Sequence, residues 1–326
     1  MNPLISVIVL NYNGRAWLRP CLTALVSQVG APAFETIVAD NGSTDGSVEF
    51  VAATFPSARI VDNVENLGFA AGNNRAASAA AAPLLVFLNN DTIPAPDWLA
   101  RLYAAHVDAG DRHIVASRIV FLKQPDVVDS AGDGYLRAGG AYKRGHGVAA
   151  AAFLQSREVF GACGAAFLIP RAIFDELGGF DESFYMVYED VDLSYRARLA
   201  GYRCWYAADA IVRHAGSGTL GRMSRDAVYH GQRNLEWTWL KNTPGGLMAR
   251  TLPAHVLYSV AGLGHYVFRG RSAAALRGKI AALAGVPRVL AARRAVQRAR
   301  RANTGSIEAL MDRGWIGVKR REKSAR

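Results

Sequence analysis

The chain has 326 residues, of which 51% are hydrophobic and 20% are charged, and its formal net charge is +11. A chain of this length and apolar content can bury a large core, which suits one α/β domain with an appendage. Three scattered cysteines with no CxxC pair favour reduced thiols in a cytosolic setting and argue against a disulfide scaffold.

The positive charge is concentrated at the C-terminal end. From Gly246 onward there are 17 Lys and Arg against 3 Asp and Glu, a net of +14, whereas residues 1–245 carry a net of −3. Basic segments bind nucleic acid or acidic membrane surfaces. The only aromatic residue beyond Phe268 is Trp315 and no nucleic-acid-binding motif is evident, so we expect no nucleic-acid partner.

Strand and helix signals alternate through the first part of the chain. No positive side chain precedes the apolar run that ends at Leu10, so a first strand is favoured over a signal peptide. Alternation predicts a parallel sheet with helices on both faces. The predicted strands are 6–10, 35–39, 59–61 and 84–88, and the predicted helices are 17–29, 47–53, 68–82 and 95–106.

Residues 126–149 are Gly-rich, and we expect them to form an irregular excursion that faces an acceptor. Regular structure is expected to resume at residues 161–169. The pattern identifies no individual binding residue within 126–149.

The sequence Asn89-Asn90-Asp91 follows the predicted strand 84–88 directly. In open α/β sheets the carboxyl ends of the strands are where ligands bind. A carboxylate placed directly after a buried strand is costly unless something binds it. Because carboxylate and amide oxygens are hard ligands, the sequence predicts a site for Mg²⁺ or Mn²⁺.

A second acidic motif, Glu189-Asp190 followed by Asp192, lies at the start of a predicted helix. Acidic residues in a first turn can simply stabilise the helix dipole, by about 0.3–1 kcal/mol. Alternatively, a carboxylate near a cation site can accept a proton from a hydroxyl.

Several motifs occur in an order that resembles a known family. They are SVIVLNYNG at 6–14, ADNGSTDGS at 39–47, NLGFAAGNNR at 66–75, FLNND at 87–91, GGFDE at 178–182 and YEDVDL at 188–193. Together they resemble glycosyltransferase family 2, with the GT-A fold: a Rossmann-like mixed sheet with helices on both faces. The resemblance covers roughly residues 4–240. The long basic tail is similar to that of bacterial rhamnosyltransferases in this family.

The resemblance implies a nucleotide-sugar site. Asp40 would face the base of the nucleotide, and Arg75 would neutralise the diphosphate near the start of its helix. The alternatives are that Asp40 caps a turn and that Arg75 is a solvated helix residue. The implied nucleotide-sugar-binding residues are Asn11, Asp40, Asn41, Asn66, Gly68, Arg75 and Asn90.

The resemblance also implies the metal ligands. The family pattern is often Asp-x-Asp, and here Asn89 stands in the first position before Asp91, so the metal should bind more weakly until the diphosphate adds its own oxygens. His214 matches a third ligand, although a lone histidine at a strand end is more often structural. The implied metal set is therefore Asp91, Asn89 and His214.

The implied chemistry is a single in-line displacement that inverts the anomeric carbon. Asp190 would be the base for the acceptor hydroxyl, and Glu189 would orient the acceptor or support the base. The donor is expected to be dTDP-L-rhamnose and the acceptor a cell-surface glycan or a lipid-linked saccharide. The alternatives are a UDP-hexose donor and a non-catalytic nucleotide-sugar-binding module.

The expected organisation is a catalytic domain, 1–245, followed by a basic amphipathic helical tail, 246–326. The catalytic domain would comprise a nucleotide-sugar half, 1–110, and an acceptor half, 111–245. The uncharged run 251–268 contains Pro253 and two glycines, so it is expected to lie on a membrane rather than span it.

Residues 277–301 suit an amphipathic helix on an anionic membrane surface, broken near Gly285 and Pro287. We therefore expect a cytoplasmic enzyme that is peripheral on the inner face of the plasma membrane. Removal of the tail should then release it while leaving donor binding largely intact. The alternative is a solvated basic tail or a partner-binding helix.

Overall fold

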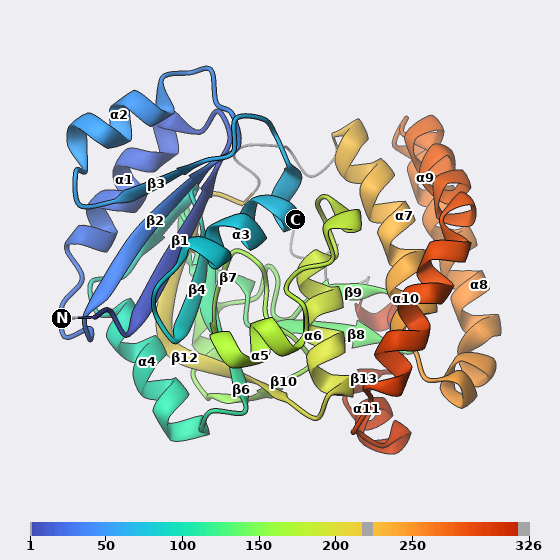
Figure 1. The fold of residues 1–326 in the computed structure, drawn as a ribbon. Coiled ribbons are helices and arrows are strands. Elements are labelled where there is room, and N and C mark those ends of the chain that lie inside the picture. The colour runs from blue at the N-terminus through green and yellow to red at the C-terminus, as the bar shows by residue number, and fades with distance from the viewer. Residues whose placement is uncertain (1, 217–223, 319–326) are drawn as a thin grey trace.

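The computed structural model describes residues 2–216 and 224–318. A large mixed sheet runs through the molecule, in the order β10-β12-β6-β11-β4-β1-β2-β3 (Figure 1). Its first half consists of four parallel strands, β1 (Ile5–Asn11), β2 (Phe34–Asp40), β3 (Arg59–Asp62) and β4 (Leu84–Asn89). These are the four strands that the alternating pattern predicts.

The second half of the sheet makes it mixed. Its strands are β5 (Thr92–Pro94), β6 (His113–Phe121), β7 (Gln124–Ser130), β10 (Arg157–Val159), β11 (Ala166–Pro170) and β12 (Arg203–His214). Strand β11 is antiparallel to both β4 and β6, and β12 is parallel to β6. Strands β4, β6 and β12 therefore point the same way, so β4 and β12 end at the same edge of the sheet.

Helices cover both faces of the sheet. One core contains residues of α1 (Arg15–Val26), α2 (Ser47–Thr54) and α4 (Trp98–Ala109). The other contains residues of α3 (Gly68–Ala79), α5 (Arg171–Glu176) and α6 (Glu189–Leu199). Sequence analysis places α1, α2, α3 and α4 to within a few residues, whereas α5 is not among the predicted helices. The predicted start of α4 is three residues too early, because the N–H of Ala95 still donates to the carbonyl of Ile211 on β12 and the helix begins at Trp98.

The prediction of an irregular segment at 126–149 is wrong. It contains most of β7 and two strands of a short second sheet, β8 (Asp133–Leu136) and β9 (Ala141–Lys143). The glycines here permit close packing: a Cβ at Gly134 would lie 2.2 Å from the ring of Tyr142 on the paired strand. Glycine content alone could not distinguish this role from a loop.

The basic tail packs against the rest of the protein. Helices α7 (Arg225–Asn242), α8 (Gly245–Phe268), α9 (Ser272–Ala284) and α10 (Val286–Arg298) lie side by side at one end of the molecule (Figure 1). They are followed by α11 (Thr304–Ala309) and β13 (Met311–Asp312), which pairs with β8. The expected break near Gly285 separates α9 from α10. The last part of the tail, 319–326, lies outside the described residues.

The tail shares buried surface with the domain before it. Leu247 of α8 is fully buried, and the indole of Trp237 on α7 donates a hydrogen bond to the carbonyl of Ala282 on α9 (3.1 Å). A cut at residue 246 would expose the apolar surface of α7 to water, which the charge distribution alone does not reveal. Among the described helices, none combines the length and apolarity needed to cross a membrane.

A buried polar cluster joins α7, α8 and α9. Glu236 accepts hydrogen bonds from His255 (2.7 Å) and Ser259 (2.8 Å) and forms an ion pair with Lys279. The His255 ring stacks on Trp239 at 3.8 Å. Burial acts to raise the pKa of Glu236, but the hydrogen bond from His255 and the charge of Lys279 outweigh it and lower the pKa to about 2.

We expect Glu236→Gln to destabilise the protein near neutral pH and to have a smaller effect in acid. The folded-state pKa lies below the unfolded value, so this stabilisation is present above about pH 4.5 and disappears as the pH falls toward 2. Between neutral and acid pH, the difference in unfolding free energy between wild type and Glu236→Gln should shrink by up to about 3 kcal/mol. Urea unfolding at pH 7 and pH 3 would test this, and a pH-independent difference would contradict it.

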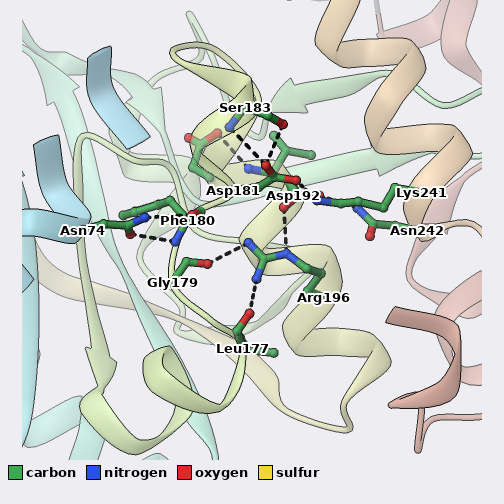
Figure 2. Close-up of polar contacts among 12 residues, drawn as sticks. Asn74, Leu177, Gly179, Phe180, Asp181, Ser183, Asp192, Arg196, Lys241 and Asn242 are labelled. Carbon is green, nitrogen blue, oxygen red and sulfur yellow. Dashed lines mark hydrogen bonds and ion pairs between the residues drawn. The ribbon is translucent and has the colours of Figure 1, made fainter. Parts of the chain in front are cut away.

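The start of α6 is tied to α7 by Asp192 (Figure 2). The buried carboxylate accepts hydrogen bonds from Arg196 (2.7 Å) and Asn242 (2.8 Å) and pairs with Lys241 at 2.6 Å. Buried charges are tolerated when they are paired in this way. Asp192 thus fixes the helix that begins with Glu189 and Asp190.

Candidate active site

A cavity of about 550 Å³ lies at the edge where β1, β2, β4 and β12 end. Of the residues that sequence analysis selects, seven line it: Asn41, Asn66, Gly68, Asn89, Asn90, Asp91 and His214. The opposite wall comes from Tyr185–Tyr188 and from helices α7 and α8, including Tyr258 and Tyr266. The basic tail therefore contributes side chains to the cavity, which its composition does not predict.

Asp91 and His214 meet in this cavity. Strand β5 pairs antiparallel with β12, which places Thr92 opposite His214. The Nε2 atom of His214 then lies 3.2 Å from Oδ1 of Asp91, and both side chains are buried. Two segments more than a hundred residues apart thus supply an imidazole nitrogen and a carboxylate oxygen to one point.

The other nitrogen of His214 is held by Asp129, a residue that sequence analysis did not select. Nδ1 of His214 lies 2.7 Å from Oδ2 of Asp129, which is fully buried. Asp129 also pairs with Lys143 at 2.8 Å and with His146 at 3.2 Å. Burial acts to raise the pKa of Asp129, but Lys143, His146 and His214 outweigh it and hold the pKa far below the usual range.

The residues present fit a divalent cation. With Nδ1 of His214 donating to Asp129, a deprotonated Nε2 would offer its lone pair to a cation held between it and Asp91, which is the arrangement of a metal-binding imidazole with a supporting carboxylate. Among the described residues no group of three or more His, Cys, Asp or Glu side chains is placed to hold a metal. The remaining ligands would therefore be the side-chain oxygen of Asn89, water, or oxygens of a bound diphosphate.

The neutral side chains near the end of β2 and the start of α3 hold two loops together. Asn41 donates hydrogen bonds to the carbonyl of Gly68 (2.9 Å) and to Oδ1 of Asn66 (3.3 Å), joining the end of β2 to the start of α3. Gly68 has φ +78°, and a Cβ there would lie 2.5 Å from the ring of Tyr185. This close approach explains the need for glycine at the wall of the cavity.

Asp40 and Asn11 lie behind the cavity wall. Asp40 accepts hydrogen bonds from Nδ2 of Asn11 (2.8 Å) and from the backbone N–H of Ser43 (2.7 Å). Asn11 in turn accepts a hydrogen bond from Asn90 at 2.7 Å. Arg75 is exposed on α3 and does not line the cavity. The structure therefore brings Asp40 and Asn11 to the site as supports of its loops and leaves Arg75 outside it.

Glu189 and Asp190 do not line the cavity themselves; they follow Tyr188, which does. Oδ2 of Asp190 accepts the backbone N–H of Gly164 at 2.7 Å, and burial raises the pKa of its carboxyl group. Burial and the charge of Asp190 also raise the pKa of Glu189, whose Oε2 has no hydrogen-bond partner among the described residues. A raised pKa makes a carboxylate a stronger proton acceptor at neutral pH.

Lys143 interacts electrostatically with residues of both parts of the site. Its ammonium pairs with Asp129, which holds His214, and its positive charge also acts to lower the pKa of Asp190. Lys143 also lines a second cavity of about 580 Å³, with Asp133 and Tyr142. We place the candidate site in the first cavity because Asp91 and His214 face it.

The chain is similar to known proteins in sequence and in fold. Residues 6–178, just over half of the chain, match the family model described as glycosyl transferase family 2. The chain is 28% identical over 259 residues to the N-acetylglucosaminyl-diphospho-decaprenol L-rhamnosyltransferase of Mycobacterium tuberculosis (strain H37Rv), covering 71% of this chain and 82% of that protein.

Other relatives match over smaller parts of their length. An uncharacterized protein of Sinorhizobium fredii is 29% identical over 232 residues, 67% of this chain, but the match spans only 25% of that protein. Validoxylamine A glucosyltransferase of Streptomyces hygroscopicus subsp. limoneus is 36% identical over 117 residues, which are 35% of this chain and 26% of that protein.

Two solved structures show the same fold. The mannosyltransferase PcManGT of Pyrobaculum calidifontis, in complex with GDP-Man and Mn²⁺, has a TM-score of 0.53 at 20% identity and covers 92% of this chain and 86% of its own. GalNAc-T7 with UDP, GalNAc and Mn²⁺ has a TM-score of 0.55 at 16% identity, over 72% of this chain and 48% of its own. The protein therefore belongs to glycosyltransferase family 2 and has the GT-A fold.

Proposed function

We propose that this glycosyltransferase moves L-rhamnose from dTDP-L-rhamnose to a hydroxyl group of a cell-surface glycan or lipid-linked saccharide. The observation that carries the proposal is the pairing of Asp91 with His214 in a cavity that Tyr188, two residues before Asp190, also lines. Support for the sugar comes from the mycobacterial L-rhamnosyltransferase, which the chain matches over 82% of that protein's length.

In this proposal Asp91 and His214, with Asn89, hold a Mg²⁺ or Mn²⁺ ion, which would neutralise charge on the leaving diphosphate. Two solved structures with the same fold are described with Mn²⁺, which supports this choice. Asp190 removes the proton of the acceptor hydroxyl as that oxygen attacks the anomeric carbon from the face opposite the diphosphate. The attack inverts the configuration of that carbon, and Glu189 orients the acceptor or supports the base.

The donor can be identified by thermal shift. The protein would be heated with dTDP-L-rhamnose, UDP-glucose or UDP-N-acetylglucosamine, with and without Mn²⁺, because a bound ligand raises the unfolding temperature with its occupancy. We expect the largest shift with dTDP-L-rhamnose and Mn²⁺, followed by transfer to a saccharide acceptor. A larger shift in unfolding temperature with a UDP-hexose would show that the UDP-hexose is the donor instead. The similarity to validoxylamine A glucosyltransferase supports this second candidate. Binding without transfer would identify a nucleotide-sugar-binding module.

We propose further that the outer face of the α8–α9 hairpin binds an anionic membrane, which would make the enzyme peripheral on the inner face of the plasma membrane. The face is apolar and largely exposed. Its residues are Leu252, Val256, Leu257, Val260, Val267 and Phe268 on α8 and Leu276, Ile280 and Leu283 on α9. Arg269, Arg271 and Arg277 lie at the turn and along α9, where they can meet lipid phosphates.

Replacing two of these apolar residues should release the protein from vesicles. We expect the double variant Leu257→Gln/Ile280→Gln to lower partitioning onto phosphatidylglycerol vesicles at least about tenfold, since each buried side chain contributes about 1.5–3 kcal/mol. Val107→Gln is the matched control, because Val107 is 59% exposed against 60% for Leu257 but lies on α4. Co-sedimentation at 150 mM salt measures the effect, and equal pelleting of all proteins would refute this surface.

A further inference from the structure

The segment Tyr185–Tyr188, directly before Glu189 and Asp190, has a strained backbone. Tyr185, Val187 and Tyr188 have φ angles of +64°, +65° and +78°, in the left-handed region that residues with a Cβ rarely adopt. They are three of the five non-glycine residues with positive φ in the described parts of the chain. Such strain persists only where neighbouring groups hold it.

One buried amide holds this segment. Asn234 on α7 is 0% exposed, and its Nδ2 lies 3.0 Å from the carbonyl oxygen of Phe184, 2.9 Å from that of Met186 and 2.6 Å from that of Val187. Its Oδ1 accepts a hydrogen bond from Arg233 at 2.9 Å. The amide is thus turned so that its donors face three carbonyls of the strained segment.

Arg233 reinforces the same contact. Its Nη2 donates to the carbonyls of Ser183 and Phe184, both at 2.9 Å. Its guanidinium lies over the ring of Trp237, 4.2 Å from the centroid, which limits its freedom. Two consecutive residues of α7 therefore bind the backbone of 183–187 by side-chain donors alone.

The segment also contacts the donor side of the cavity. The carbonyl of Tyr185 accepts the N–H groups of Phe69 (2.7 Å) and Ala70 (3.2 Å) at the start of α3. All four residues from Tyr185 to Tyr188 line the cavity, and Tyr188 is the residue from which α6 begins. A change in this segment would therefore alter the direction in which α6, with Asp190 in its first turn, leaves Tyr188.

We propose that Asn234, assisted by Arg233, is a positioning residue for sugar transfer. It holds Tyr185–Tyr188 in the strained form that places Asp190 against the acceptor hydroxyl. This rests on the proposed function of Asp190. Without these donors the three residues can relax to negative φ, and the first turn of α6 moves with them. Asn234 itself touches neither donor nor acceptor in this proposal.

The test compares Asn234→Ala with Glu236→Gln. Both side chains lie on α7, but Glu236 bonds His255 and Ser259 on α8 rather than the strained segment or α6. We expect Asn234→Ala to lower kcat about 10- to 100-fold, because a misplaced base is poorly aligned. Donor affinity, measured by calorimetry, should fall much less than kcat. Glu236→Gln should lose thermal stability while keeping near-normal kcat.

Hydrogen exchange gives a readout that does not depend on activity. In Asn234→Ala the backbone amides of 184–190 and of Phe69 and Ala70 should exchange faster, with little change elsewhere. If Asn234→Ala does not fold, Arg233→Gln, which retains Asn234, should show both effects more weakly. Unchanged exchange, or an equal fall of kcat in Glu236→Gln, would overturn the proposal. A wild-type protein without transferase activity would refute the proposed function. Hydrogen exchange would still test whether Asn234 and Arg233 hold the strained segment.

Discussion

Asp190→Asn is expected to lower kcat by about 10²–10⁴-fold, the usual contribution of a positioned base. The amide keeps the size of the side chain and can still accept the N–H of Gly164, so the start of α6 is expected to stay in place. Donor and metal affinity should remain close to wild type, because Asp91 and His214 are unchanged. A transfer assay combined with calorimetric titration of the donor measures both quantities.

The pH profile provides the control for this variant. Burial raises the pKa of Asp190 above its usual 3.8, so kcat of the wild type should fall as the pH drops through that raised value. This acid limb should be missing from the residual activity of Asp190→Asn. If Asp190→Asn kept near-normal turnover, the base would have to be Glu189 or Asp192, the other carboxylates of that motif.

Asp91→Asn should remove the metal-dependent part of donor binding. The substitution takes away the one carboxylate that His214 faces in the cavity, which leaves only neutral side chains to hold the cation. Since a bound cation contributes several kcal/mol of charge stabilisation, we expect activity to fall at least about 10²-fold. Calorimetry with dTDP-L-rhamnose, with and without Mn²⁺, should show that added metal no longer tightens binding.

Asp129→Asn is a milder variant that tests the same cation site. It keeps a hydrogen-bond acceptor for Nδ1 of His214 but removes the negative charge, so Mn²⁺ affinity should weaken about 10- to 100-fold. Electron paramagnetic resonance of free Mn²⁺ measures this without donor or turnover. Equal Mn²⁺ binding by wild type, Asp91→Asn and Asp129→Asn would show that the cation site is elsewhere.

The donor half of the fold follows from local sequence patterns. Each of its four strands is a short run rich in apolar residues, and each turn after them is marked by Asn, Asp or Gly, so the strands and the edge that carries Asp91 can be predicted. The pattern does not give the strand order, in which β1 lies between β2 and β4. The family and the GT-A fold are confirmed by the match over residues 6–178 and by the solved structures. Helix ends shift by a few residues because tertiary contacts decide them.

The contacts that complete the site depend on residues far apart in the chain. Asp129 lies within strand β7 with no motif around it, and only the pairing of β6 with β7 and β12 brings it to His214. Arg75 matches a motif, yet the rotation of α3 leaves it exposed. In the basic tail, Tyr258 and Tyr266 face the cavity while their neighbours on α8 face outward. The overall composition of the tail carries no information about this difference between single side chains.

The pairing of β13 with β8 has a consequence for the order in which the protein matures during synthesis. Met311 pairs with Tyr135, so one edge of the small sheet stays open until residue 311 has left the ribosome. An unpaired edge is a template for association with other chains. Nascent molecules stalled before residue 311 should therefore aggregate more readily than molecules released after residue 318, even though the large sheet and the candidate metal ligands are already present in both.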